Sequence, residues 1–187
     1  MIKLPNNKSI LILSSPRTGS TLLGQFLSNQ LGYKFFNEPS LNQKNLNDFF
    51  IYKDLNNFFV LKEHYRSFVR HYNKNFINDN IFVIRIRRKN IVEQVISNYI
   101  AVSRKKFVYL NDIEPDVISL NDNYLLENFN YIGKQNKDLD NIPFVINCDI
   151  FYEDLNIDEG FDTIPTPKPK NYDELKNWAH KLLQDKL

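Results

Sequence analysis

ILILSSPRTGSTLLGQFLSNQL, residues 10–31, is the stretch that decides the fold of this chain. Its opening apolar run predicts a buried strand, and the helix-period apolar residues that follow predict a helix with one apolar face. The turn between them must be tight, and Gly19 supplies the backbone freedom for it. The first amides of the helix, with Ser20 and Thr21, would then face an anion, so the stretch predicts a phosphate-binding loop.

This loop is not a Walker A motif, which requires a second glycine and a lysine. Its one cation is Arg17, which precedes the glycine. Residues 14–21, SSPRTGST, resemble the 5′-phosphosulfate loop of sulfotransferases, which take a sulfuryl group from 3′-phosphoadenosine 5′-phosphosulfate (PAPS). A plain strand-turn-helix is the alternative, because serine and threonine also favour turns and helix starts. The resemblance implies that the donor is bound by Arg17, Thr18, Gly19, Ser20 and Thr21.

Composition and charge narrow the function classes. The chain has 187 residues, of which 42% are hydrophobic and 14% aromatic, and this is enough for a single domain, 1–187, with a sizeable core. A net charge of +2 is too small to indicate nucleic-acid binding. The sequence shows neither a signal peptide nor an apolar run of membrane-spanning length. We therefore expect a cytoplasmic protein that binds neither nucleic acid nor membrane.

Apolar runs alternate with helix-like segments along the chain, and most of the runs are continuous, as in parallel strands that are buried on both faces. Asn90 with Glu93, and Asn171 with Glu174, resemble capping pairs at two helix starts. The pattern predicts an α/β fold of the P-loop-like three-layer type, with a central parallel sheet of about five strands flanked by helices and a ligand at the carboxyl ends of the strands. We expect strands at 9–14, 32–36, 58–63, 80–87 and 143–148.

A second cationic cluster lies in IRIRRKNIVEQVISNYIA, residues 84–101. It resembles the sulfotransferase 3′-phosphate motif, in which an arginine after a strand and a serine two helical turns later hold the 3′-phosphate of PAPS. The resemblance implies these roles for Arg88 and Ser97, and a planar guanidinium with a hydroxyl suits a phosphate. The spacing is one residue longer than is usual in the family, which leaves Lys89 as a rival to Arg88.

A third constellation is FFVLKEHYRSF, residues 58–68, where Lys62 and His64 lie on the same side of an extended chain. It resembles the Lys-x-His motif of cytosolic sulfotransferases, which implies that Lys62 contacts the sulfuryl group and that His64 removes the acceptor's proton. Carbohydrate- and tyrosine-directed relatives use a glutamate after the second strand, and Glu38 occupies that place. The ordinary pKa of histidine favours His64, whereas a glutamate needs burial or hydrogen bonds. Both stay candidates for the base.

Three further segments bear on the donor and acceptor sites. The family's C-terminal Arg-Lys-Gly segment is missing, and Lys168 and Lys170 are its possible substitutes, within a proline-rich stretch, 156–170, that we expect to be an extended connector. Segments 38–57 and 104–118 lack clear periodicity and are candidate walls of the acceptor site.

Together the motifs imply transfer of the sulfuryl group of PAPS to a hydroxyl or amine of a small-molecule or carbohydrate acceptor, without a metal. One alternative is a P-loop-type nucleotide or nucleoside kinase, which the missing Walker lysine disfavours. Another is a catalytically inactive nucleotide-binding module of the same fold. The expected second phosphate site favours PAPS, because ATP has no 3′-phosphate.

Overall fold

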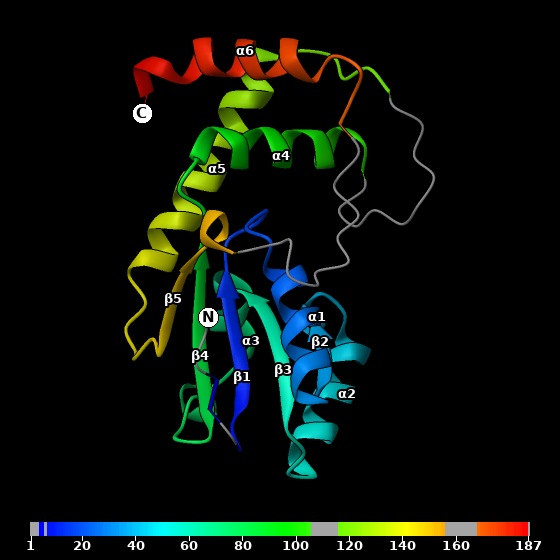
Figure 1. Ribbon diagram of the computed structural model, residues 1–187, viewed down its shortest axis with the longest axis vertical. Coiled ribbons are helices and arrows are strands. Elements are labelled where there is room, and N and C mark those ends of the chain that lie inside the picture. The colour runs from blue at the N-terminus through cyan, green and yellow to red at the C-terminus, as the bar shows by residue number, and fades with distance from the viewer. Residues whose placement is uncertain (1–3, 6, 106–115, 156–167, 187) are drawn as a thin grey trace.

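The computed structural model describes residues 4, 5, 7–105, 116–155 and 168–186. Its centre is one parallel sheet with the strand order β2-β3-β1-β4-β5 (Figure 1). The expected three-layer α/β fold is thus confirmed. The strands are β1 (Ser9–Ser14), β2 (Lys34–Asn37), β3 (Phe59–His64), β4 (Ile81–Arg87) and β5 (Cys148–Phe151).

Helices cover both faces of the sheet because side chains alternate along each strand. On β1, Ile10 and Ile12 point to one face and belong to a core with Leu23 of α1. Leu11 points to the other face, into a core that contains Phe49 of α2. The helices that cover the sheet are α1 (Ser20–Leu31), α2 (Gln43–Asp54) and α3 (Tyr65–His71).

Three more helices lie at the carboxyl end of the sheet, at the top of Figure 1. They are α4 (Ile91–Ser103), α5 (Asp122–Asp140) and α6 (Tyr172–Leu183), and they share a core around Tyr99, Leu125 and Leu175. Within the described ranges, no helix has the length and apolar character to cross a bilayer. Short 3₁₀ helices complete the chain: η1 (Pro39–Leu41), η2 (Lys74–Phe76), η3 (Tyr152–Asp154) and η4 (Gln184–Lys186).

The last strand begins later than the sequence predicts. The expected range was 143–148, but β5 begins at Cys148. Phe144 instead packs against the core on the α2 and α3 side of the sheet. At Asn147 the backbone N–H donates to Val83 O (3.0 Å), and the side-chain oxygen accepts from Val83 N (2.8 Å). A side-chain amide thus takes over backbone pairing just before the strand begins.

The segment 38–57 is mostly helical although its sequence lacks clear periodicity, and its role as a wall of the acceptor site stays a prediction. It contains α2, whose start is capped by the side chain of Asn42. Leu46 and Phe49 of this helix are buried in the core that also contains Leu11 of β1. Half of this helix's residues are polar and exposed, so its apolar face is too narrow for a clear period. The segment 104–118 and the connector 156–170 lie mostly outside the described residues.

One expected capping pair is confirmed and the other is wrong. Asn90 caps α4 by accepting a hydrogen bond from Glu93 N (3.0 Å). At α6, the Asn171 side chain makes no capping bond. It accepts from Ile118 N (3.0 Å) and donates to Ile118 O (2.8 Å), so it ties the start of α6 to the segment before α5.

Candidate functional site

The loop 15–19 connects the central strand β1 to α1 at the carboxyl edge of the sheet. Thr18 is fully buried, and its hydroxyl donates to Ser15 O (3.1 Å), so Thr18 holds the shape of the loop from inside. Gly19 has φ 72°, a conformation that favours glycine. A Cβ atom at Gly19 would also collide with the ring of Tyr152, which covers the loop. Both constraints explain the glycine.

The start of α1 leaves backbone donors for an anion. In the described part of the chain, no side chain caps this helix. Ser20 is buried, and the hydroxyl of Thr21 donates to the side-chain oxygen of Asn37 at the end of β2 (3.3 Å). The first-turn amides and the positive end of the helix dipole are therefore available to an anion here.

Three residues that the sequence assigns to the two ends of the donor lie together. Arg17 has φ 63°, and its Nε donates to Ser97 Oγ on α4 (3.0 Å). Arg88, which follows β4, donates from Nη1 to the backbone carbonyl of Arg17 (3.3 Å). The two guanidinium groups and the hydroxyl thus gather beside the start of α1.

Residues of η3 contact the side chain of Arg88 and hold it in place. Its guanidinium lies over the Tyr152 ring, 5.1 Å from the centroid, and its ion pair with Glu153 spans 3.7 Å. This is too long for a hydrogen bond, and the buried Nε of Arg88 has no hydrogen-bond partner among the described residues. The rival Lys89 forms an ion pair with Asp154 at the surface (2.5 Å). Arg88, rather than Lys89, is directed toward the loop.

Lys62, Glu38 and His64 form a second cluster across β1 from Arg88. Lys62 is buried in β3 and pairs with Glu38. The same carboxylate oxygen, Glu38 Oε1, lies 3.3 Å from His64 Nε2. His64 Nδ1 lies 3.4 Å from Ser14 Oγ, and the two residues are partners in the strand register. Both candidate bases are therefore in contact with each other and with the candidate sulfuryl-binding lysine.

Burial and charge adjust the protonation of this cluster. Burial raises the pKa of Glu38, but the charges of Lys62 and His64 outweigh it and leave this pKa below its ordinary value. Burial lowers the pKa of Lys62, and the nearby Glu38 carboxylate opposes the shift. Burial and the Lys62 charge lower the pKa of His64 to about 4. At neutral pH the imidazole is therefore neutral, and the Glu38 carboxyl is ionised.

Glu63 is a part of the site that sequence reasoning missed. It is fully buried, and its carboxylate accepts hydrogen bonds from Ser40 N (3.0 Å), Ser40 Oγ (2.8 Å) and Tyr72 OH (2.9 Å). Burial raises its pKa, although these hydrogen bonds oppose the shift. Ser40 belongs to the turn that follows Glu38. The backbone N–H of Glu38 itself donates to Lys62 O (2.8 Å). Glu63 thus positions Glu38, and its signal in the sequence is a carboxylate within an apolar strand.

A polar network that ties the loop to α4 and α5 was also missed. Gln94 is fully buried, and its Nε2 donates to Ser15 Oγ (2.9 Å) and Pro16 O (2.6 Å). Asn136 of α5 donates to Gln94 Oε1 (3.0 Å) and accepts from Ser15 Oγ (2.5 Å). Every group in this ring has a partner, so the network fixes the loop on two helices. The sign of this network in the sequence is Gln94, an amide among the apolar residues of α4.

Lys168 and Lys170 lie at the start of α6. The Lys168 ammonium lies over the Tyr172 ring, 4.5 Å from the centroid, and the Lys170 backbone N–H donates to Asp116 O (2.7 Å). Both side chains are exposed. Their contact with a nucleotide stays a prediction.

No protein-family model matches this chain, and no curated protein is significantly similar to it. A function must therefore be argued from the residues of the site themselves.

Proposed function

We propose that this protein transfers the sulfuryl group of PAPS to a hydroxyl or amine of an acceptor. The observation that carries the proposal is the convergence of Arg17, Ser97 and Arg88 beside the start of α1. In the proposed complex, the α1 amides and Arg17 bind the 5′-phosphosulfate, while Arg88 and Ser97 bind the 3′-phosphate.

The partly unsatisfied side chain of Arg88 supports its assignment to the 3′-phosphate. Its Nε is buried, and it lacks a hydrogen-bond partner within the described ranges. A buried donor without a partner is costly, so such a group is a candidate for contact with a ligand. A 3′-phosphate oxygen on Arg88 would supply the missing acceptor, and the hydroxyl of Ser97 could donate to the same phosphate.

Lys62 and Arg17 would supply the charge that transfer requires. In the reaction, the acceptor oxygen or nitrogen forms a bond to sulfur, and the bond from sulfur to the bridging 5′-phosphate oxygen breaks. The electron pair of that bond leaves with the nucleotide. Cations beside the bridging and sulfuryl oxygens stabilise the charge that develops there. Lys62 is buried at the end of β3, where its ammonium has little freedom to move into solvent.

We assign the acceptor's proton to Glu38 on geometry, because its carboxylate contacts both Lys62 and His64. The pKa of Glu38, like that of His64, is below its ordinary value, so basicity does not choose between the two. The low pKa of His64 removes the advantage that an ordinary histidine would have as a base near neutral pH. His64 Nε2 faces the Glu38 carboxylate, so the neutral imidazole donates there when its proton is on Nε2. In this arrangement Glu38 accepts the proton, and His64 positions the carboxylate.

The test is the transfer of labelled sulfate from PAPS to a panel of phenols, sugars and amines. Arg17→Ala and Lys62→Ala should each lower the rate by about a hundredfold. Lys44→Ala, at an exposed position on α2, is the matched control and should leave the rate unchanged. Unchanged rates in both site variants would show that the assigned roles are wrong.

Nucleotide binding separates the competing functions. Adenosine 3′,5′-bisphosphate should bind more tightly than ADP or ATP in calorimetry, because only the bisphosphate reaches Arg88 and Ser97. ATP binding without any binding of the bisphosphate would indicate a kinase. Tight bisphosphate binding with no transfer to any acceptor would indicate an inactive nucleotide-binding module.

A further inference from the structure

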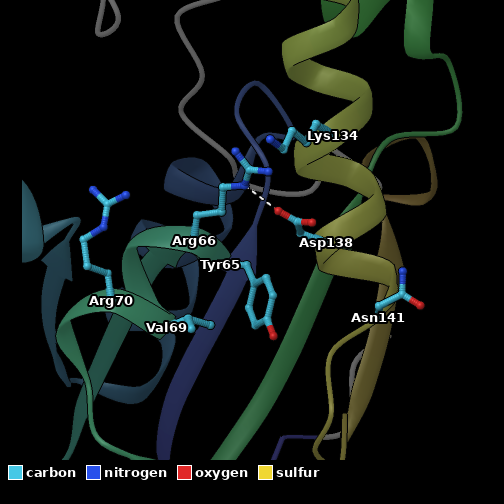
Figure 2. Close-up of a pocket in the computed structure, with 7 residues that line it drawn as sticks. All are labelled: Tyr65, Arg66, Val69, Arg70, Lys134, Asp138 and Asn141. Atoms are coloured by element: carbon cyan, nitrogen blue, oxygen red, sulfur yellow. Dashed lines mark hydrogen bonds and ion pairs between the residues drawn. The ribbon is translucent and has the colours of Figure 1, made fainter.

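A groove of about 550 Å³ lies between α3 and α5, where α3 begins directly after His64 (Figure 2). An ion pair between Arg66 of α3 and Asp138 of α5 crosses it. Figure 2 shows the Lys134 side chain at the same end of the groove as the Arg66 guanidinium. The residues of its wall that matter here are Tyr65, Arg66, Arg70, Lys134, Asp138 and Asn141.

The charge of the groove is positive. Three of its lining residues are cations, and Asp138 is its one carboxylate. Asp138 pairs with Arg66. The side chains of Arg70 and Lys134 are exposed and make neither an ion pair nor a hydrogen bond with any other residue that the structure describes. Two cations on opposite walls are therefore available to an anionic group.

The groove adjoins the candidate catalytic cluster, because Tyr65 in its wall directly follows His64 in the chain. On α5, the nearby exposed aromatic residue is Tyr131. This residue precedes Lys134 by one helical turn, so the two share a face of α5. Burial raises the pKa of Tyr131, the charge of Arg66 lowers it, and the charge of Glu38 raises it. Tyr131 is 46% exposed, which leaves part of its aromatic surface open to a ligand.

We propose that this α3–α5 groove binds the acceptor of sulfuryl transfer and selects one that carries a negative charge, with an acidic sugar as the best-matched class. Arg70 and Lys134 attract the sugar's carboxylate through their positive charge, and the Tyr131 ring, one helical turn from Lys134, packs against the sugar. The Asn141 Nδ2 already donates to Lys137 O (2.7 Å), and its side-chain oxygen is available to accept from the sugar's hydroxyls. This proposal rests on the function proposed above, and it adds the acceptor class and the residues that select it.

The test uses two acceptors that differ at a single ring substituent, which is charged in one and neutral in the other. 4-Nitrophenyl β-D-glucuronide has a carboxylate where 4-nitrophenyl β-D-glucoside has a hydroxymethyl group. The parent protein should have a kcat/KM about tenfold higher for the glucuronide at low salt, and added salt should reduce this preference. The double variant Arg70→Gln/Lys134→Gln should bring the ratio close to one. Lys181→Gln, an exposed position on α6, is the control and should keep the preference.

Direct binding makes the two proposals separately testable. Calorimetry with each glycoside, in the presence of adenosine 3′,5′-bisphosphate, measures acceptor binding without turnover. If the bisphosphate binds but the glucuronide binds no better than the glucoside, or neither glycoside binds, the groove proposal is wrong while the donor site stands. A charge-dependent preference for the glucuronide without transfer from PAPS would leave the groove proposal standing and refute the proposed reaction. Stronger binding of an acidic peptide than of the glucuronide would also overturn the sugar assignment.

Unchanged bisphosphate affinity in the double variant will show that it is folded. A glucuronide preference that survives in that folded variant contradicts the role given to Arg70 and Lys134.

Discussion

Arg17 Nε donates a 3.0 Å hydrogen bond to Ser97 Oγ, although 80 positions separate the two residues in the sequence. The contact joins the loop after β1 to the helix after β4. These two strands are neighbours in the sheet, so the elements that follow them begin at the same edge. The loop proposed to bind the 5′ end of the donor thereby meets the helix proposed to bind its 3′-phosphate.

Ser97→Ala should weaken the binding of adenosine 3′,5′-bisphosphate by about tenfold, because a hydrogen bond to a charged group is lost. The binding of AMP, which lacks the 3′-phosphate, should change much less. Calorimetry with both nucleotides checks this prediction. Ser103→Ala, at an exposed position of the same helix, is the control. An equal loss of affinity for both nucleotides would show that Ser97 supports the loop and does not contact the 3′-phosphate.

Gly19→Ala should lower the free energy of unfolding by at least about 1–2 kcal/mol, because alanine is strained at φ 72°. The new methyl group would also collide with Tyr152. Gly133→Ala is the matched control: this position is inside α5, where a methyl group meets open space. It should stabilise the protein by roughly 0.5–1 kcal/mol. Chemical denaturation of both variants measures the difference, and a neutral Gly19→Ala would contradict the loop geometry.

Glu63→Leu should cost about 2–4 kcal/mol of folding free energy, because it leaves the buried donors on Ser40 and Tyr72 without an acceptor. Glu63→Gln should cost far less, since its amide oxygen can accept from both donors and its nitrogen can donate to the Ser40 hydroxyl. Urea denaturation compares the two. If they are equally destabilised, the hydrogen bonds do not account for the role of Glu63.

Acid should destabilise the protein through His64. Its pKa is 6.5 in an ordinary environment and about 4 in the folded protein, so between these values the unfolded chain binds the additional proton. Stability is therefore present above pH 6.5 and declines as the pH falls toward 4, by about 2 kcal/mol between pH 7 and 5. Denaturant titrations across this range measure the decline.

His64→Asn is the reference for this measurement, because asparagine does not titrate. Its stability should fall less steeply over the same pH range. Parallel curves for the parent and the variant would mean that another group causes the acid sensitivity.

Local sequence patterns were sufficient for the frame of the fold. The apolar run before Gly19 and the helix period after it specify β1, the tight turn and α1, because each depends only on neighbouring residues. The same holds for β3, β4 and the Asn90 cap of α4. β5 was placed too early because Phe144 is apolar for a different reason: it packs against a helix-covered core and is not part of the strand.

The candidate site was only partly accessible to such reasoning. Lys62 and His64 could be paired because a strand places residues i and i+2 on one side. That Glu38 bridges both depends on η1, which the distant Glu63 positions through Ser40. The buried Gln94 network likewise joins segments that are far apart in the chain.

Short-range periodicity and backbone preference in the sequence specify the sheet, the tight turn between β1 and α1, and the types of residue at the sheet's edge. Which side chains are in contact depends on the tertiary structure. It directs Arg88 to the loop and Lys89 to the surface, and it lowers the pKa of His64 by burying it next to Lys62. Contact and burial depend on residues that come together only on folding, so no local pattern can encode them.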